Sequence, residues 1–118
     1  MPARFMALTP MVPTGGPLSE ALNYYCGTLG FTVEWRDDGG GVAGIARGDV
    51  RLNLVENENR EWIDNASFRI RLDDLDAFYA EIRGVAGRLE PPFVTPWGQR
   101  EVHLIVPSGV CFQFYQTD

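Results

Sequence analysis

The order of predicted strands and helices repeats once along the chain, and this repeat constrains the fold more than any other feature. Alternating and helical spacings of apolar residues predict a strand, a helix and three strands in the first half, over 4–12, 17–29, 31–36, 42–47 and 50–55. The same order returns in the second half, over 67–72, 75–85, 88–94, 100–106 and 110–115. Because so small a sheet cannot bury one face alone, we expect both halves to share one core.

The predicted fold is therefore α+β, with two tandem βαβββ modules in a single domain over residues 1–118. Module one covers about 1–56, a polar linker covers 57–66, and module two covers about 67–118. We expect helices to cover one face of the curved, mixed sheets, and the other face to form a groove.

Both helices are predicted from apolar residues spaced three or four apart, with recognisable ends. Gly30 is placed to end the first helix in the left-handed conformation, and Asp73 or Asp74 can cap the second. The two apolar faces comprise Leu18, Leu22, Tyr25 and Leu29, and Leu75, Phe78, Ile82 and Val85.

The composition narrows the classes of molecule that the protein could bind. The formal net charge is -6, which opposes general binding to nucleic acid or to an anionic membrane and is compatible with a cationic ligand. No apolar run reaches membrane-spanning length and no signal peptide is recognisable, so we expect a cytoplasmic location. Cys26 and Cys111 are interpreted as buried, reduced thiols.

Short motifs in a fixed order resemble the vicinal oxygen chelate superfamily, which includes glyoxalase I, extradiol dioxygenases, fosfomycin-resistance enzymes and bleomycin-resistance proteins. The chain looks most like the bleomycin-resistance branch. The motifs are Tyr24-Tyr25 with Leu29-Gly30-Phe31, Arg47-Gly48-Asp49-Val50, Asp73-Asp74-Leu75-Asp76 with Phe78-Tyr79, Pro96-Trp97-Gly98, and Pro107-Ser108-Gly109. This resemblance implies the glyoxalase/bleomycin-resistance fold.

The resemblance also implies four metal-ligand positions in the enzymes of the superfamily. Here they fall near Pro10 and on Asn53, Ser67 and Gln113, which offer neither His nor carboxylate. A shift of the strand register could bring Glu56 into the groove, which would supply only one carboxylate. The single His, His103, lies in the penultimate strand, outside the family pattern, and is interpreted as structural. We therefore expect no metal, no cofactor, no catalytic residue and no enzyme activity.

If Asn53, Ser67 and Gln113 face the groove, strand alternation places further side chains beside them. These are Arg51, Val55, Arg69, Arg71, Cys111 and Tyr115. The alternative interpretation is a solvated sheet face without a ligand.

Three tryptophans, Trp35, Trp62 and Trp97, are predicted near the groove rims, where large aromatic rings suit planar ligands. Each alone could equally be structural. The resemblance implies groove roles for Glu34, Trp35 and Trp97, and a less certain one for Asp64. Arg69 stands where that family can have a stacking aromatic, which is a departure from its pattern. The ligand-binding set is thus Glu34, Trp35, Asn53, Trp62, Asp64, Ser67, Arg69, Trp97, Cys111 and Gln113.

The resulting hypothesis is a metal-free homodimer that sequesters a planar, cationic antibiotic such as bleomycin. Pro10 and Pro13 resemble the hinge of an N-terminal arm that crosses to the partner chain, and the alternative is an interrupted edge strand in a monomer. Two other functions stay open. One is a metal-dependent enzyme of the same superfamily, and the other is a binding or self-resistance module for another natural product.

Overall fold

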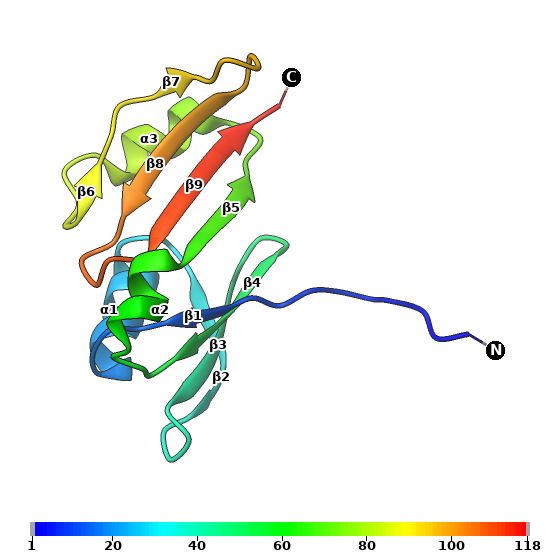
Figure 1. The fold of residues 1–118 in the computed structure, drawn as a ribbon, viewed down its shortest axis with the longest axis vertical. Helices are drawn as coiled ribbons and strands as arrows, with labels where there is room; N and C mark the ends of the chain where they lie inside the picture. The colour runs from blue at the N-terminus through cyan, green and yellow to red at the C-terminus, as the bar shows by residue number, and fades with distance from the viewer. Residues whose placement is uncertain (1, 118) are drawn as a thin grey trace.

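The computed structural model describes residues 2–117 and contains the two predicted βαβββ modules, joined by a short helix (Figure 1). Module one comprises β1 (Met11–Pro13), α1 (Leu18–Gly27), β2 (Thr32–Asp37), β3 (Val42–Arg47) and β4 (Val50–Val55). Module two comprises β5 (Ser67–Arg71), α3 (Leu75–Ile82), β6 (Arg88–Leu89), β7 (Phe93–Val94), β8 (Arg100–Ile105) and β9 (Cys111–Gln116). The predicted α+β fold class is confirmed.

Each module forms its own mixed sheet, and the two sheets have matching topologies. The strand order is β1-β4-β3-β2 in module one and β5-β9-β8-β6 in module two, with β7 also paired to β8. In both sheets the first strand runs parallel to the last, while the remaining pairs are antiparallel. The predicted strand over 88–94 is thus realised as two short strands, β6 and β7.

The helices begin and end where local chemistry satisfies their backbone groups. The amide of Leu18 at the start of α1 donates to the Glu56 carboxylate at 2.8 Å, and Gly30 follows this helix with a φ of 76°. Asp74 caps α3 by accepting from the amide of Ala77 at 3.0 Å. With ten, six and eight residues, none of the helices within residues 2–117 could cross a membrane.

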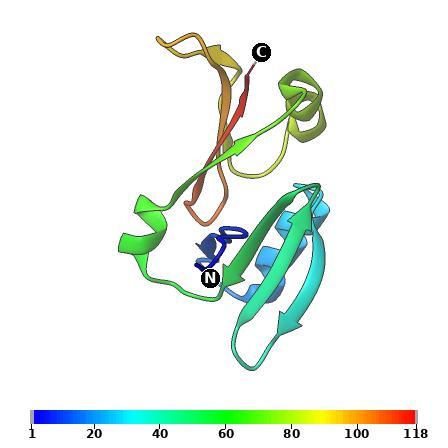
Figure 2. The ribbon, with the colours of Figure 1, turned by 90° about the vertical axis from the view of Figure 1, so that its right-hand side faces the viewer.

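The two modules share one hydrophobic core, which lies on the helix-bearing sides of both sheets (Figure 2). Tyr25 of α1 reaches across to Phe112 of β9, with ring centroids 5.9 Å apart. Arg47 of β3 forms an ion pair with Glu81 of α3 at 2.8 Å and lies over the ring of Phe78. Residues of each module thus help to cover the apolar face of the other.

One local expectation is wrong, and one short helix was not predicted. The first strand begins at Met11 instead of Arg4, and residues 2–10 belong to no strand and extend away from the body (Figure 1). The side chains of Phe5 and Leu8 are 98% and 92% exposed. The polar linker contains a short helix, α2 (Arg60–Asn65). Asn59 caps this helix by accepting a hydrogen bond from the amide of Trp62 at 3.0 Å.

The cap of α3 gives a direct test of the described helix boundary. Asp74→Ala should lower the free energy of unfolding by about 1 kcal/mol, because it leaves helix amides without an acceptor. Urea unfolding followed by circular dichroism measures the change. The neighbouring Asp73→Ala, which removes an exposed carboxylate with no capping bond, should stay within about 0.5 kcal/mol of wild type. Equal losses in both variants would contradict the assigned cap.

Candidate functional site

Each sheet has a second face, opposite the shared core, that carries polar side chains. In β4, Leu52 and Leu54 are buried while the alternate residues Arg51 and Asn53 are not. We call this the module-one face; it includes Met11, Trp35, Gly44, Arg51, Asn53 and Val55, which the strand register places together. The module-two face includes Ser67, Arg69, Arg71, Glu101, His103, Cys111, Gln113 and Tyr115.

Trp35 lies flat on the module-one face because β3 has no side chain beneath it. A Cβ atom added to Gly44 would be only 2.1 Å from the indole nitrogen of Trp35. The opposite side of the ring remains open, since Trp35 is 47% exposed. Asn53 pairs directly with Gly44 in the neighbouring strand and therefore lies beside the ring. The face thus presents a supported aromatic surface next to a hydrogen-bonding amide.

A β-bulge explains how two successive residues of β2 serve the same face. The register of β2 against β3 shifts between Val33 and Trp35, which leaves Glu34 as the extra residue. Glu34 consequently reaches the face as well and accepts from the Arg51 guanidinium at 3.1 Å. The structure therefore brings together three predicted site residues, Glu34, Trp35 and Asn53.

The module-two face is organised around Arg69. Its guanidinium donates to Glu101 at 2.9 Å, to the Gln113 side chain at 2.9 Å and to the Gln99 side chain at 2.7 Å. The same group lies over the ring of Tyr115, 4.4 Å from its centroid. These contacts hold the planar guanidinium of Arg69 in one orientation on the module-two face. Arg69 and Gln113 are brought together as predicted.

Glu101 is a buried carboxylate beneath this network. It is only 2% exposed, and His103 Nε2 lies 2.8 Å from its second oxygen. Burial acts to raise the pKa of Glu101, but hydrogen bonds from Arg69 and His103 outweigh burial and hold the pKa below its usual value. The carboxylate is therefore ionised at neutral pH and compensates the charge of Arg69.

Ser67 and Cys111 occupy one end of the module-two face, where they pair directly across β5 and β9. Both cysteines are free thiols and half-buried, so the expectation of full burial is wrong. Burial raises the pKa of the Cys111 thiol, although a hydrogen bond with Ser67 opposes the shift. This end of the face is therefore neutral at physiological pH.

Trp97 lies in a tight turn at the edge of the module-two face. The turn is closed by the Gly98 amide, which donates to the Thr95 carbonyl at 2.9 Å. Trp97 is 71% exposed and lines a shallow hollow of about 180 Å³ with Gln99, the same residue that binds Arg69. The ring is therefore available to a ligand that touches the network.

The two remaining predicted site residues lie on α2, away from both groups. Trp62 is half-buried and packs against the hydrophobic core, which accounts for this ring without a ligand. Asp64 forms an ion pair with Arg60 at 2.6 Å. The structure does not bring these two side chains together with Trp35 or Arg69 by any described contact.

The residues at the implied metal positions do not fit a divalent ion. The register places Met11 opposite Asn53, so Met11, not Pro10, takes the first position on the face. In module two, the Arg69 guanidinium already binds the oxygen of Gln113 at 2.9 Å, and a divalent cation there would be repelled. Among residues 2–117, no three His, Cys, Asp or Glu side chains gather as a metal site.

Sequence reasoning missed Glu101 and assigned His103 only a structural role. The signal was present, because Glu101 and His103 alternate with the buried residues Val102 and Leu104 in β8. Their pairing with Tyr115 and Gln113 places them on the module-two face. A polar residue at every second position of an otherwise buried strand would have indicated this face.

Comparisons with known proteins agree with this architecture. Residues 14–114 match the family model of the Glyoxalase/Bleomycin resistance protein/Dioxygenase superfamily. The chain belongs to this superfamily. A bleomycin resistance protein from Geobacillus stearothermophilus is 26% identical, with 91% of this chain and 93% of that protein covered.

Two solved structures extend the comparison. The bleomycin-binding protein of bleomycin-producing Streptomyces verticillus, complexed with copper(II)-bleomycin, is 26% identical with a TM-score of 0.84. The alignment covers 98% of this chain and 99% of that one. An antibiotic-binding protein from Streptomyces sp. CB03234, at 21% identity and a TM-score of 0.75, shares the fold; the alignment covers 98% of this chain and all of that one.

The buried carboxylate predicts how stability depends on pH. Because folding lowers the pKa of Glu101, its stabilising contribution is complete above the ordinary value of 4.5 and is lost as the pH falls through the lowered value. Glu101→Gln should destabilise the protein at pH 7 by about 1–3 kcal/mol and flatten the acid limb of the stability profile. Urea unfolding at several pH values measures both effects.

A matched control separates the effect of a buried carboxylate from the effect of removing a negative charge. Glu90 pairs with Arg88 at 3.1 Å, but both side chains are exposed. Glu90→Gln should therefore change stability by less than about 0.5 kcal/mol and leave the acid limb unchanged. An unaltered acid limb in Glu101→Gln would show that Glu101 is not a linked group.

Proposed function

We propose that this protein binds a planar antibiotic of the bleomycin type and protects by sequestration, without a metal and without chemistry on the ligand. The observation that carries the proposal is the Trp35 ring, which is supported from below by Gly44 and open above. A flat heteroaromatic ligand stacks favourably on such a surface. Relatives that cover nearly the whole chain bind bleomycin or resist it, at 26% identity.

The charges of the chain support a cationic ligand at long range. The net charge of -6 attracts cations. The arginines at the centres of the two faces do not oppose this attraction, because Glu34 compensates Arg51 and Glu101 compensates Arg69. At short range, Gln99, Gln113 and Asn53 supply neutral hydrogen-bonding groups, which suit the amide-rich edge of such a ligand.

The proposed binding unit is a homodimer with an exchanged N-terminal arm. The module-one and module-two faces belong to separate sheets, and each is open to solvent in a single chain. A groove enclosed on both sides therefore needs a second copy. The arm of residues 2–10 leaves the body with Phe5, Met6 and Leu8 exposed, and burying these side chains against a partner would stabilise a dimer.

Titration with bleomycin tests the ligand. We expect quenching of tryptophan fluorescence with a dissociation constant of about 1 µM or lower. Trp35→Ala and Trp97→Ala should each weaken binding at least about tenfold in calorimetry, because each removes a stacking ring. Gly44→Ala should weaken it similarly, since the added Cβ displaces the Trp35 ring.

Trp62→Phe is the matched control, because it changes a tryptophan that packs against the core. It should bind bleomycin within about twofold of wild type. If folded wild-type protein shows neither quenching nor heat with bleomycin, bleomycin is not the ligand. If the three face variants bind like wild type, these faces are not the site.

Removing residues 1–9 tests the arm. The full chain should elute as a dimer in size exclusion with light scattering, and the truncated chain as a folded monomer with weakened bleomycin binding. Phe5→Ser with Leu8→Ser should shift the equilibrium in the same direction, because these exposed side chains lose their apolar contacts with the partner. A full chain that is monomeric at the concentrations of the titration would refute the dimer.

A further inference from the structure

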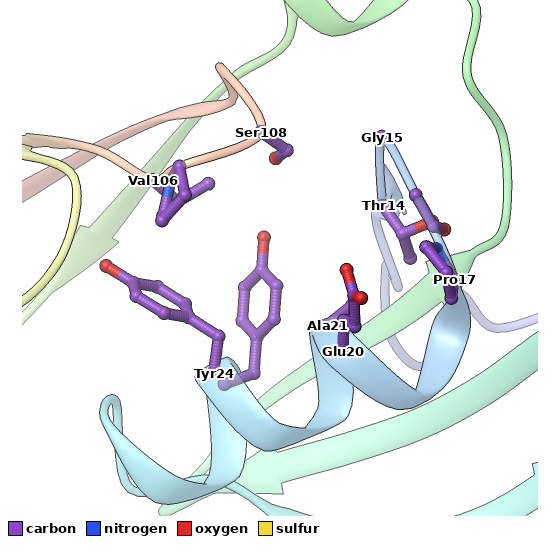
Figure 3. Close-up of a pocket in the computed structure, with 11 residues that line it drawn as sticks. Thr14, Gly15, Pro17, Glu20, Ala21, Tyr24, Val106 and Ser108 are labelled. Carbon is purple, nitrogen blue, oxygen red and sulfur yellow. The ribbon is translucent and has the colours of Figure 1, made fainter.

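A cavity on the helix-bearing side lies between the two modules, apart from both polar faces (Figure 3). It has a volume of about 250 Å³. Its walls are the loop before α1, the first turns of α1, and the turn between β8 and β9. The two loops approach closely, since a Cβ at Gly15 would lie 2.7 Å from Ser108 Cβ. A ligand here would therefore touch both modules.

One polar atom at this cavity lacks a partner. Tyr25 lines the cavity and is only 3% exposed, yet its buried hydroxyl makes no hydrogen bond within residues 2–117. It is the only buried side-chain oxygen or nitrogen in that part of the chain left in this state. A buried hydroxyl without a partner is costly, so a missing partner is indicated.

The hydroxyl retains its proton. Burial, with a smaller effect of Tyr24, raises the pKa of Tyr25 well above its usual value. Tyr25 can therefore still donate one hydrogen bond to an oxygen of a ligand.

The other polar groups around the hollow mainly accept. The Tyr24 hydroxyl donates its proton to the Ala86 carbonyl at 2.6 Å, and the Thr14 hydroxyl donates to the Gly16 carbonyl at 2.7 Å. Only lone pairs remain on these two oxygens. Glu20 adds a carboxylate, and Figure 3 shows it at the same hollow as Tyr24, Thr14 and Ser108. Apart from the hydroxyls of Tyr25 and Ser108, the polar side chains that line the cavity therefore offer acceptors, and none of the lining residues is a cation.

The start of α1 does not reverse this charge preference. A helix N-terminus ordinarily favours an anion. Here the Glu56 carboxylate already binds the Leu18 amide at 2.8 Å. No further anion is needed at this end.

A second cavity between the modules differs from the first in the charges of the residues that line it. That cavity, of about 480 Å³, is lined by the β3–β4 turn and the start of α3. There the helix carboxylate, Glu81, is paired with Arg47 at 2.8 Å. Among residues 2–117, Glu20 has no described cationic partner. At the first cavity, by contrast, no lining residue is a cation.

We propose that the cavity between α1 and the β8–β9 turn binds a small protonated amine that also carries a hydroxyl or carbonyl oxygen. The ammonium group meets Glu20 and the lone pairs of Tyr24 and Thr14. The ligand oxygen accepts from Tyr25. The volume is below that of drug-sized sites, which begin near about 300 Å³, so the ligand is of the size of an amino alcohol. This site is independent of the proposed antibiotic site.

Ethanolamine is a suitable probe, followed by amide chemical shifts in ¹H–¹⁵N NMR of the full chain at neutral pH. Binding of so small a ligand is weak, so the titration extends to about 50 mM. We expect shifts confined to residues 14–25 and 106–108. Ethylene glycol, which lacks the ammonium, and propylamine, which lacks the oxygen, should bind at least about tenfold more weakly, equivalent to about 1.4 kcal/mol.

Two variants test the assigned contacts. Tyr25→Phe and Glu20→Gln should each weaken ethanolamine binding about tenfold or more. Glu90→Gln, which removes an exposed carboxylate that does not line the cavity, should leave it unchanged. The proposal fails if ethanolamine shifts no amide in these segments, if ethylene glycol binds equally well, or if both variants bind like wild type. Shifts around Trp35 or Arg69 alone would also refute it.

Discussion

The two modules are held together by one shared hydrophobic core, in which Tyr25 of α1 meets Phe112 of β9, and this core orients the rest of the structure. Because both helix-bearing sides turn inward to one core, both polar faces turn outward. Outward faces can carry residues that contribute little to the core. Trp35 is an example: its ring is only half covered, and its position depends on the glycine beneath it more than on the shared core.

The Arg69 network holds the polar side chains of the module-two face in a fixed arrangement. Glu101 is buried, so an unpaired charge there would be strongly destabilising. The guanidinium of Arg69 and the ring of His103 satisfy both of its oxygens. A cation built into the chain thus stands beside Gln113, at a position implied for a metal ligand. The face remains polar and fixed, which suits recognition more than Lewis-acid chemistry.

How much the sequence could predict depends on how far apart in the chain the interacting residues lie. Helices α1 and α3, the turn at Gly30 and the cap at Asp74 depend on neighbours within a few residues, and each was predictable. Strand alternation also placed Arg69 on the correct face. Three other features depend on the register between strands or on how the modules meet. They are the β-bulge beside Trp35, the bond from Arg69 to Glu101, and the helix in the linker. No local pattern fixes those.

The repeated topology gives the protein two polar faces, and their side chains differ. The module-one face offers an aromatic surface, Trp35, while the module-two face offers a fixed arginine, Arg69, with amide side chains around it. In a dimer that brings one face opposite the other, each groove has one stacking wall and one hydrogen-bonding wall. A ligand that fills it must be flat on one side and rich in polar atoms on the other. Because Gln99 and Gln113 each give their side-chain oxygen to Arg69, their amide nitrogens are the groups that would select acceptor atoms on that side of the ligand, which a purely aromatic groove could not do.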